Sequence, residues 1–519
     1  QLTTHTSRRP PSVPWIRNKL GRARRLAGRV VGGLWSQEGT LGQQVMRGAF
    51  WTVANEWTSK GLTFVQTVIL VRLLVPADFG IMRVSGFLLA GMAVFTRTGM
   101  DMAVIQRKDA DRETVDTAWT INLLRDIVLY AGVFLVAPWA ARFYENPIIC
   151  PILRVLGLKL LFNGFKNIGL TLLKKDLDFR VHEIFMMTTV ALGVTITIVA
   201  AFILRSVWAI AIGQAAMAGV RAVGSYVVHP YRPRFRLRLA EARRLFGFGK
   251  WMLAAGIVVF LKTQGDDAIL GKMLGMEALG FYTLAYALSN LPAKAITHMI
   301  SAVTFPAYSK LQDDKKRLGN AFLRVLRVNG ALVVPAAAGL FVLAPDIVGV
   351  VYGNRYMPMV GAFRILCIFG LFRALATTCS PVFNAVGKPW IITIAVSANV
   401  VVMLAVIFPL TQAYGIAGTS LATLIPYLVE VPLYFAITAR LSGLAWTKPW
   451  RAVIPAFLAT GVMMVCLFLM KTQWSAAAVS RLLLFVVIGF TLYVGTVALF
   501  CRRFARETWR MVGDLGAER

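Results

Sequence analysis

Ionisable side chains recur at a four-residue spacing within long apolar segments of this chain. Three pairs of opposite charge have this spacing: Glu56 with Lys60, Arg97 with Asp101, and Lys262 with Asp266. Lys294 and His298 repeat it without an acid. Residues four apart lie on one face of a helix, so the members of each pair can meet. An ionisable group at a membrane centre costs about 2.5–3.5 kcal/mol unless it is paired or faces water, so these pairs indicate either helix packing or a polar cavity.

Depth within the segments separates these two interpretations. Cavity lining is favoured for the side chains that lie deepest by residue count: Glu56, Lys60, Lys262, Asp266 and Lys294. Arg97 and Asp101 lie near the inner end of their segment, where a packing ion pair or a position at the membrane interface explains them equally well. Arg83 lies close to the start of the same segment and is a candidate for the outer mouth of the cavity.

Basic residues outnumber acidic ones in the segments of interest. The basic set is Lys60, Arg83, Arg97, Lys159, Lys166, Lys262 and Lys294, and the acidic set is Glu56, Asp101, Asp266 and Asp267. A cationic interior suits an anionic cargo, since lysine and arginine bind phosphate through charge-assisted hydrogen bonds. The acids can pair with these bases or bind a coupling ion, H⁺ or Na⁺, and the doublet Asp266–Asp267 is the best candidate. An equally good alternative pairs one of the two with Lys262 and leaves the other facing water.

The elements that carry these residues are long apolar segments. The composition is 57% hydrophobic and 15% charged, with a mean hydropathy of +0.65, which is typical of a multispan membrane protein. A span needs about 20 helical residues. Fourteen segments qualify: 43–74, 79–105, 114–141, 151–173, 182–204, 206–228, 245–273, 278–308, 318–344, 357–381, 389–411, 413–437, 449–470 and 476–500. Because lipid forces each segment to satisfy its own backbone hydrogen bonds, we predict an all-α integral membrane protein of about 14 transmembrane helices.

Basic clusters mark alternate connections between these segments. Connections of even number and both tails are rich in lysine and arginine, whereas the odd ones hold few: Arg142, Arg205, Arg355 and Lys471. This asymmetry predicts cytoplasmic N- and C-termini. The net charge of +32 lies mostly in these loops, so topology explains it better than a nucleic-acid partner.

Signatures of ATP-driven, metal-dependent or enzymatic chemistry do not occur. The chain has no GxxxxGK[ST] phosphate loop, and its five cysteines show no CxxC spacing. The longest external connection, around Ala344 to Tyr356, is too short for an extracytoplasmic catalytic domain. We therefore expect no catalytic residue, no metal site, no cofactor and no disulfide.

The apolar segments also form a repeat. RLLVPADFG at 72–80 and KMLGMEALG at 272–280 occupy equivalent places, and nine of 43 positions between Trp51 and Ala93 carry the same residue type 200 positions later. Six predicted helices separate the two copies, so both enter the membrane from the same side. The repeat is therefore expected to be parallel.

Several motifs resemble one family of transporters. Leu74–Gly80 (LVPADFG) resembles the L-x-P-x-D-[FY]-G connection of the polysaccharide transporters, the Wzx-like oligosaccharide and lipopolysaccharide flippases of the MOP superfamily, which also holds MATE-like and MurJ-like proteins. Gly280 and Tyr282, followed by Thr304–Asp313 (TFPAYSKLQD), are similar to that family's eighth span and its cytoplasmic exit. Asn384–Pro389 (NAVGKP) resembles its turn between spans 10 and 11.

The resemblance implies a flippase that breaks no bond. Two parallel-related six-helix lobes would enclose a central cavity, with two C-terminal helices appended. The cargo would be an undecaprenyl-pyrophosphate-linked oligosaccharide, moved from the cytoplasmic to the outer leaflet of the bacterial inner membrane by alternating access. Coupling to an H⁺ or Na⁺ gradient is implied, as are membrane lipids and the polysaccharide polymerase or export machinery as partners.

These expectations divide the chain into predicted membrane and cytoplasmic parts. The predicted parts are a basic cytoplasmic tail (1–42), an N-lobe (43–228), a basic cytoplasmic linker (229–244), a C-lobe (245–437), two further helices (438–500) and a cytoplasmic tail (501–519). The residues expected to bind pyrophosphate are Lys60, Arg83, Arg97, Lys262 and Lys294, and those expected to pair or to couple ions are Glu56, Asp101, Asp266 and Asp267. Two alternatives stay open: a MATE-like drug/cation antiporter, and a membrane glycosyltransferase or ligase.

Overall fold

The computed structural model describes residues 41–94, 112–175, 178–237, 239–291, 293, 304–473 and 478–500. All regular structure within these ranges is helical. Eight of the described helices are long and apolar enough to cross a membrane. This confirms the predicted all-α multispan fold, while the number 14 stays a prediction. The residues named above that lie outside the described ranges are Arg97, Asp101, Lys294 and His298, together with most of the two tails.

The N-terminal helices follow the predicted segments with one break. They are α2 (Leu41–Leu73), α3 (Pro76–Val94), α5 (Arg112–Phe143), α6 (Ile149–Phe165), α7 (Gly169–Lys175), α8 (Phe179–Leu204) and α9 (Trp208–Val228). The segment predicted as one span over 151–173 is split between α6 and α7, because the backbone leaves the helix at Lys166 with ψ 135°. Asn167 stabilises the break, since its Nδ2 donates to the carbonyl of Tyr231 at 2.6 Å and its Oδ1 accepts from the amide of Gly169 at 2.9 Å.

The C-terminal helices begin with α10 (Leu239–Ser289) and continue from α12 onward. They comprise α12 (Lys315–Val342), α13 (Ala344–Ile347), the π-helical η1 (Val348–Tyr352), the 3₁₀ turn η2 (Asn354–Met359), α14 (Val360–Ala385), α15 (Trp390–Leu441), α16 (Thr447–Gln473) and α17 (Ala478–Phe500).

Two of these elements join pairs of predicted spans. α10 covers the segments predicted at 245–273 and 278–308 as far as Ser289, and α15 covers those at 389–411 and 413–437. Each holds one glycine with a positive φ, Gly275 at 81° and Gly415 at 59°. Such values break the helical path and are strained for other residues. The predicted connections are therefore single-glycine reversals with no separate loop.

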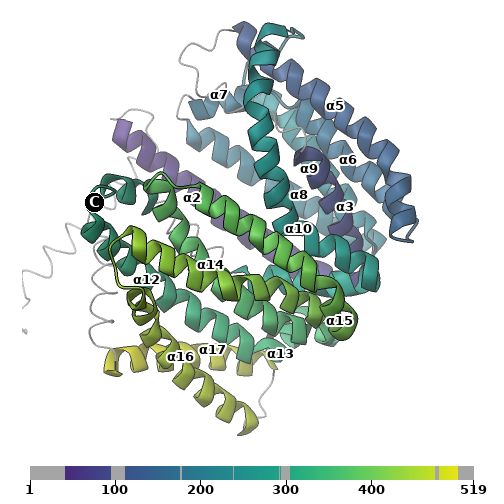
Figure 1. The fold of residues 1–519 in the computed structure, drawn as a ribbon. Helices are drawn as coiled ribbons and strands as arrows, with labels where there is room; N and C mark the ends of the chain where they lie inside the picture. Colours follow the sequence, from purple (N-terminus) through teal and green to yellow (C-terminus); the bar gives the residue numbers. More distant parts are fainter. Residues whose placement is uncertain are drawn as a thin grey trace, which may run out of the picture.

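The helices pack as two groups that α10 brings together. Within the first group α5 packs on α6, α8 on α9, and α2 on α8; within the second, α12 packs on α14 and α16, and α14 packs on α15. α10 lies against α3 of the first group and against α14 and α15 of the second. Figure 1 shows helices α3 to α9 mainly on one side, helices α12 to α17 on the other, and α10 between them.

The closest approach between α3 and α10 joins the two copies of the repeat. A Cβ added to Gly80 would lie 1.9 Å from the carbonyl oxygen of Met276, and one added to Gly280 would lie 1.8 Å from that of Pro76. The two contacts are equivalent at the 200-residue offset, so the copies meet in a reciprocal, two-fold manner. We call these four residues the α3–α10 junction, and they explain why both copies of the motif end in glycine.

Polar contacts reinforce this junction. Asp78 accepts from the backbone amides of Val75 at 3.1 Å and Val207 at 3.2 Å, which ties α3 to the start of α9. The Tyr356 hydroxyl donates to the carbonyl of Leu74 at 3.0 Å. Asp78 and Gly80 of the LVPADFG segment therefore hold helix ends together.

Candidate functional site

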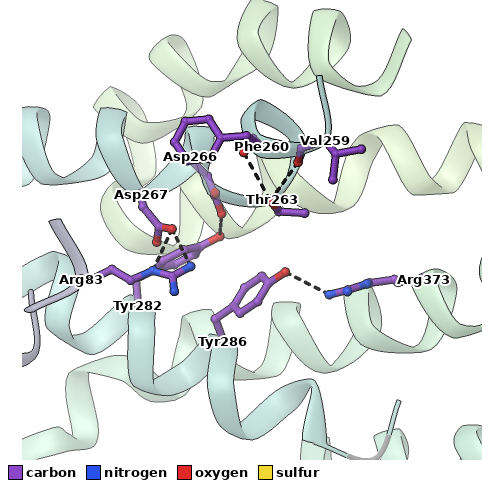
Figure 2. A network of polar contacts seen from close by, with 9 residues as sticks. All are labelled: Arg83, Val259, Phe260, Thr263, Asp266, Asp267, Tyr282, Tyr286 and Arg373. Carbon is purple, nitrogen blue, oxygen red and sulfur yellow. Dashed lines mark hydrogen bonds and ion pairs between the residues drawn. The ribbon is translucent and has the colours of Figure 1, made fainter. Parts of the chain in front are cut away.

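An ion pair between α3 and α10 lies at the centre of the candidate site. Nε of Arg83 is 2.8 Å and Nη2 is 2.6 Å from Oδ2 of Asp267. The Asp267 side chain is 2% exposed and that of Arg83 is 31% exposed. Figure 2 shows the guanidinium reaching from α3 to the carboxylate on α10. The pair therefore links the two groups of helices one turn beyond the α3–α10 junction.

The second carboxylate of the doublet points toward a tyrosine. The hydroxyl of Tyr282 donates to Oδ2 of Asp266 at 2.5 Å. Oδ1 of Asp266 is buried and has no hydrogen-bond partner among the described residues. One turn further along α10, the hydroxyl of Tyr286 accepts from Nη1 of Arg373 at 3.1 Å (Figure 2). Asp266 is thus a buried acid with one oxygen still available for a proton or a ligand.

Lys262 finds its acid on α15. Its Nζ lies 3.6 Å from Oε2 of Glu430, whose side chain is 4% exposed. The same nitrogen lies 4.8 Å from the centroid of the Tyr427 ring, within range of a cation–π contact. Asn399 donates to Oε2 of Glu430 at 2.5 Å. Two groups from α15, the Glu430 carboxylate and the Tyr427 ring, therefore hold the ammonium, and Asn399 orients the carboxylate.

These contacts surround a cavity of about 180 Å³. Its polar lining includes Lys262, Asp266, Tyr286, Arg373, Asn399 and Tyr427. We call the eight residues Arg83, Lys262, Asp266, Asp267, Tyr282, Tyr286, Arg373 and Glu430 the charged network. It holds three bases and three acids, so an incoming anion can take Arg83 from Asp267 or Lys262 from Glu430.

A larger cavity, of about 310 Å³, lies within the first group of helices. Asn122, Arg125, Asp126 and Lys166 contribute to its lining. Oδ1 of Asp126 is 2.8 Å from Nη2 of Arg125. This cavity is bounded by α3, α5 and α6 with the break after α6, whereas the charged network includes both copies of the repeat. We therefore place the candidate site at the network.

The structure corrects one of the predicted pairings. Lys262 and Asp266 do not pair, because Lys262 contacts Glu430 and Asp266 contacts Tyr282. The alternative for the acidic doublet, with one acid paired to Lys262 and the other facing water, is therefore wrong, since Asp266 and Asp267 are 4% and 1% exposed. Arg83, predicted as a candidate for the outer mouth, is held by Asp267, and its place relative to the membrane stays a prediction.

One predicted pair forms as expected. Nζ of Lys60 lies 2.7 Å from Oε1 of Glu56 along α2, and their side chains are 40% and 35% exposed.

Sequence reasoning missed several members of the site. Glu430 is an acid inside an apolar segment, so the rule used for the other residues could have found it. Arg373 lies in a predicted span, but from the sequence alone its charge could be explained equally well by a side chain that reaches the membrane interface. Tyr282 and Tyr286 gave no signal beyond their place near the second repeat motif. Among the residues that the structure describes, no cluster of three or more histidine, cysteine, aspartate or glutamate side chains is placed to hold a metal ion.

Comparison with protein families gives a match over the middle of the chain. Residues 69–361 match the model of a family described as "Polysaccharide biosynthesis protein". The chain is 28% identical over 338 residues to the lipopolysaccharide biosynthesis protein WzxC of Escherichia coli K12, covering 65% of this chain and 69% of that protein. It is 26% identical to the succinoglycan biosynthesis transport protein ExoT of Rhizobium meliloti, covering 66% of this chain and 70% of the relative.

The fold is also similar to that of a solved structure. The lipid II flippase MurJ, in an inward closed conformation, superimposes with a TM-score of 0.70 at 14% sequence identity. The superposition covers 88% of this chain and 99% of MurJ.

Proposed function

Because the chain belongs to the polysaccharide biosynthesis protein family, whose model covers residues 69–361, we propose that it is a Wzx-like flippase. Its cargo is an oligosaccharide linked to a polyprenyl pyrophosphate, which it moves from one leaflet to the other. It is a transporter and not an enzyme. The ExoT relative is named a transport protein and MurJ a lipid II flippase, which supports this assignment.

The observation that carries the proposal is the Arg83–Asp267 ion pair between the two copies of the repeat. A pyrophosphate offers several oxygen acceptors to an arginine, which binds phosphate in a planar, two-point manner. In our proposal the pyrophosphate takes Arg83 from Asp267. Since this pair joins α3 to α10, its exchange weakens the contact that keeps the two helix groups closed.

The remaining bases of the network give the cargo further contacts. Lys262 and Arg373 line the cavity from α10 and α14. The sugar-pyrophosphate head cannot enter hydrocarbon, whereas the polyprenyl tail can stay in lipid. Rocking of the two groups about the bound head then exposes it to one side and afterwards to the other.

We propose that acids of the network couple transport to an ion gradient. Asp266 has a buried oxygen without a hydrogen-bond partner among the described residues, which suits a proton or Na⁺. The coupling ion is identified by measuring transport after dissipating the H⁺ or the Na⁺ gradient separately. Transport that survives both treatments contradicts this part of the proposal.

We propose that the chain lies in the bacterial cytoplasmic membrane, with both termini in the cytoplasm and the α3–α10 junction near the outer surface. The distribution of lysine and arginine supports this orientation. Cysteines introduced at Glu145 and at Lys315 test it, because a membrane-impermeant thiol reagent should label the first and not the second in intact cells. The polysaccharide polymerase and the export machinery are the partners that would receive the product.

Binding of a short-chain polyprenyl pyrophosphate to purified protein tests the role of the network. We expect Arg83→Gln or Lys262→Ala to weaken binding by roughly tenfold, corresponding to one charge-assisted contact of about 1.4 kcal/mol. Arg317→Gln is the matched control, because Arg317 is an exposed arginine in an ion pair with Asp314 outside the network. Equal loss in the control would show that the network is not the binding site, whereas binding of organic cations in place of the pyrophosphate would favour the MATE-like antiporter. Product formation from a sugar donor would favour a glycosyltransferase.

A further inference from the structure

The segment Tyr231–Leu237 (YRPRFRL), which we call the strap, connects the two groups of helices. It has no helical structure and follows the end of α9 at Val228. Arginines at 232, 234 and 236 alternate with Pro233, Phe235 and Leu237. The pattern is unusual for a simple connection, because three guanidinium groups alternate with an apolar set along seven residues.

The first group of helices fixes the strap through buried acceptors. Asp116, which is 0% exposed, accepts at Oδ1 from the Tyr231 hydroxyl at 2.6 Å and from the backbone amide of Arg234 at 3.0 Å. The amide of Arg236 donates to the hydroxyl of Thr120 at 3.0 Å. Burial, together with the hydrogen bond to Asp116, raises the pKa of Tyr231, so its hydroxyl keeps the proton that it donates. The Tyr231 hydroxyl and the backbone amides of Arg234 and Arg236 therefore attach the strap to α5.

The three arginines, Phe235 and Leu237 of the strap are exposed. Phe235 is 64% exposed and Leu237 is 47% exposed. Arg232, Arg234 and Arg236 are exposed as well. Arg236 contacts Glu113 at 3.1 Å and Arg232 donates to the carbonyl of His229 at 2.9 Å, but a guanidinium has five N–H donors and keeps others available.

The strap lies at the level where membrane-spanning helices end. It crosses the first turns of α5, which begins at Arg112, and it starts three residues after the end of α9. Two further basic side chains, Lys174 and Lys175, lie in the last turn of α7, which packs against α8 and α9. Arginine beside exposed phenylalanine and leucine fits a membrane surface, where the charge meets headgroups and the ring enters the acyl boundary.

We propose that the strap is a binding site for anionic phospholipids. In an extended chain, alternate residues are about 7 Å apart, so the three arginines present a row of phosphate-binding groups. Phe235 and Leu237 insert between the headgroups. The contact holds the connection between the two groups of helices against the membrane surface. It is separate from the charged network and does not depend on what the protein transports.

A fluorescent probe on the strap tests this proposal in bilayers. Leu237→Cys is labelled with a thiol-reactive fluorophore in full-length protein whose Cys150, Cys466 and Cys501 are replaced by serine. The protein is reconstituted with acyl-brominated phosphatidylglycerol or acyl-brominated phosphatidylcholine at equal low mole fraction. We expect at least threefold stronger quenching by the anionic lipid, because each arginine near an anionic surface favours association on the order of fivefold.

Two triple variants distinguish the effect of the strap arginines from the effect of the protein's net positive charge. Replacing Arg232, Arg234 and Arg236 by glutamine should bring the two quenching efficiencies to the same value. Replacing Lys315, Lys316 and Arg317 by glutamine removes the same charge from the exposed start of α12 and should leave the preference for the anionic lipid intact.

Phe235→Ser, a single substitution at an exposed position, should reduce quenching by both lipids. Equal quenching by both lipids in the parent, or equal loss in the two triple variants, overturns the proposal. Neither result bears on flipping, because no transport is measured.

Discussion

At the scale of single residues, the account depends on exchanging partners within a buried charged network. Removing both members of a buried ion pair is often close to neutral for stability, whereas removing one leaves an uncompensated charge that costs about 3–5 kcal/mol. Arg83 and Asp267 make such a pair, with the acid almost fully buried. The stability and the transport role of the pair can therefore be separated.

We expect Asp267→Asn and Arg83→Gln to destabilise the protein individually, and the double variant Arg83→Gln/Asp267→Asn to recover most of the lost stability. Transport should not recover in the double variant, because the phosphate-binding guanidinium is still missing. Thermal unfolding in detergent and cargo transport in liposomes are the two measurements. Recovery of transport in the double variant would show that Arg83 serves only to neutralise Asp267.

A second ion pair between the helix groups gives a pH-dependent prediction. Nζ of Lys272 on α10 lies 2.7 Å from Oε1 of Glu145, in the turn after α5. The hydrogen bond and charge of Lys272 lower the pKa of Glu145. Because the folded-state pKa of this acid is depressed, the contribution of the pair is fully present above the ordinary carboxyl pKa and is lost as the pH falls through the lowered value.

We therefore expect acid to favour separation of α10 from the α5–α6 turn. Glu145→Lys should have the same effect at neutral pH, and the exchanged pair Glu145→Lys/Lys272→Glu should reverse it. Distances between spin labels on the two helix groups, measured at neutral and acid pH, follow the change. A pH response of equal size in Glu145→Gln would mean that another group is responsible.

At the scale of elements, the α3–α10 junction depends on two glycines that meet backbone atoms. Gly80→Ala places a methyl group against the carbonyl of Met276, and Gly280→Ala places one against that of Pro76. Overpacking of this kind costs typically 1–3 kcal/mol, and here a rigid backbone must give way. Either variant should separate the two helices and shift the population toward an open junction.

Gly86 is the matched control, because it lies on the same helix and a Cβ added there meets nothing within 4 Å. Labelling of a cysteine at Ala77 by a soluble thiol reagent reports opening of the junction. We expect faster labelling in Gly80→Ala and Gly280→Ala and an unchanged rate in Gly86→Ala. Similar rates in all three variants would show that the contact does not control closure.

The reversal at Gly275 within α10 gives an independent test of the fold. Gly275 has φ 81° and no atom within 4 Å of an added Cβ, so Gly275→Ala is opposed by backbone strain alone. Such strain costs about 1–3 kcal/mol. Gly361→Ala, at a position with the same open space and no positive φ, should be close to neutral. The melting temperatures of the two variants compare these costs, and equal values would contradict the reversal at Gly275.

The helices could be predicted from the sequence because membrane spans depend on local length and polarity. The motif at 72–80 and its copy also located the helix ends that meet at the α3–α10 junction. The break at Asn167 could not be predicted, since its partner carbonyl at Tyr231 lies 64 residues away. The same holds for Arg83 and Asp267, which are 184 residues apart. Four-residue spacing predicted Lys60 with Glu56 correctly, but gave Lys262 the wrong acid because a closer carboxylate comes from another helix.

At the scale of the whole molecule, the two copies of the repeat meet at one glycine-rich junction and share one charged network. The network lies beside the junction, and its bases Arg83 and Lys262 are held by acids. In our proposal, an anionic head that binds these bases changes the contact between the two halves. The proposal thereby links recognition of the cargo to movement of the protein without any covalent step.

Transport by the purified protein tests this account most directly. Proteoliposomes that hold only this protein and a fluorescent polyprenyl-pyrophosphate oligosaccharide are assayed by quenching the label from outside. We predict that the protected fraction of the label becomes accessible at a rate well above that of protein-free vesicles. Lys262→Ala and Arg83→Gln should slow this rate, and Arg317→Gln should not. A rate equal to that of protein-free vesicles under H⁺, Na⁺ and zero gradients would contradict the flippase assignment.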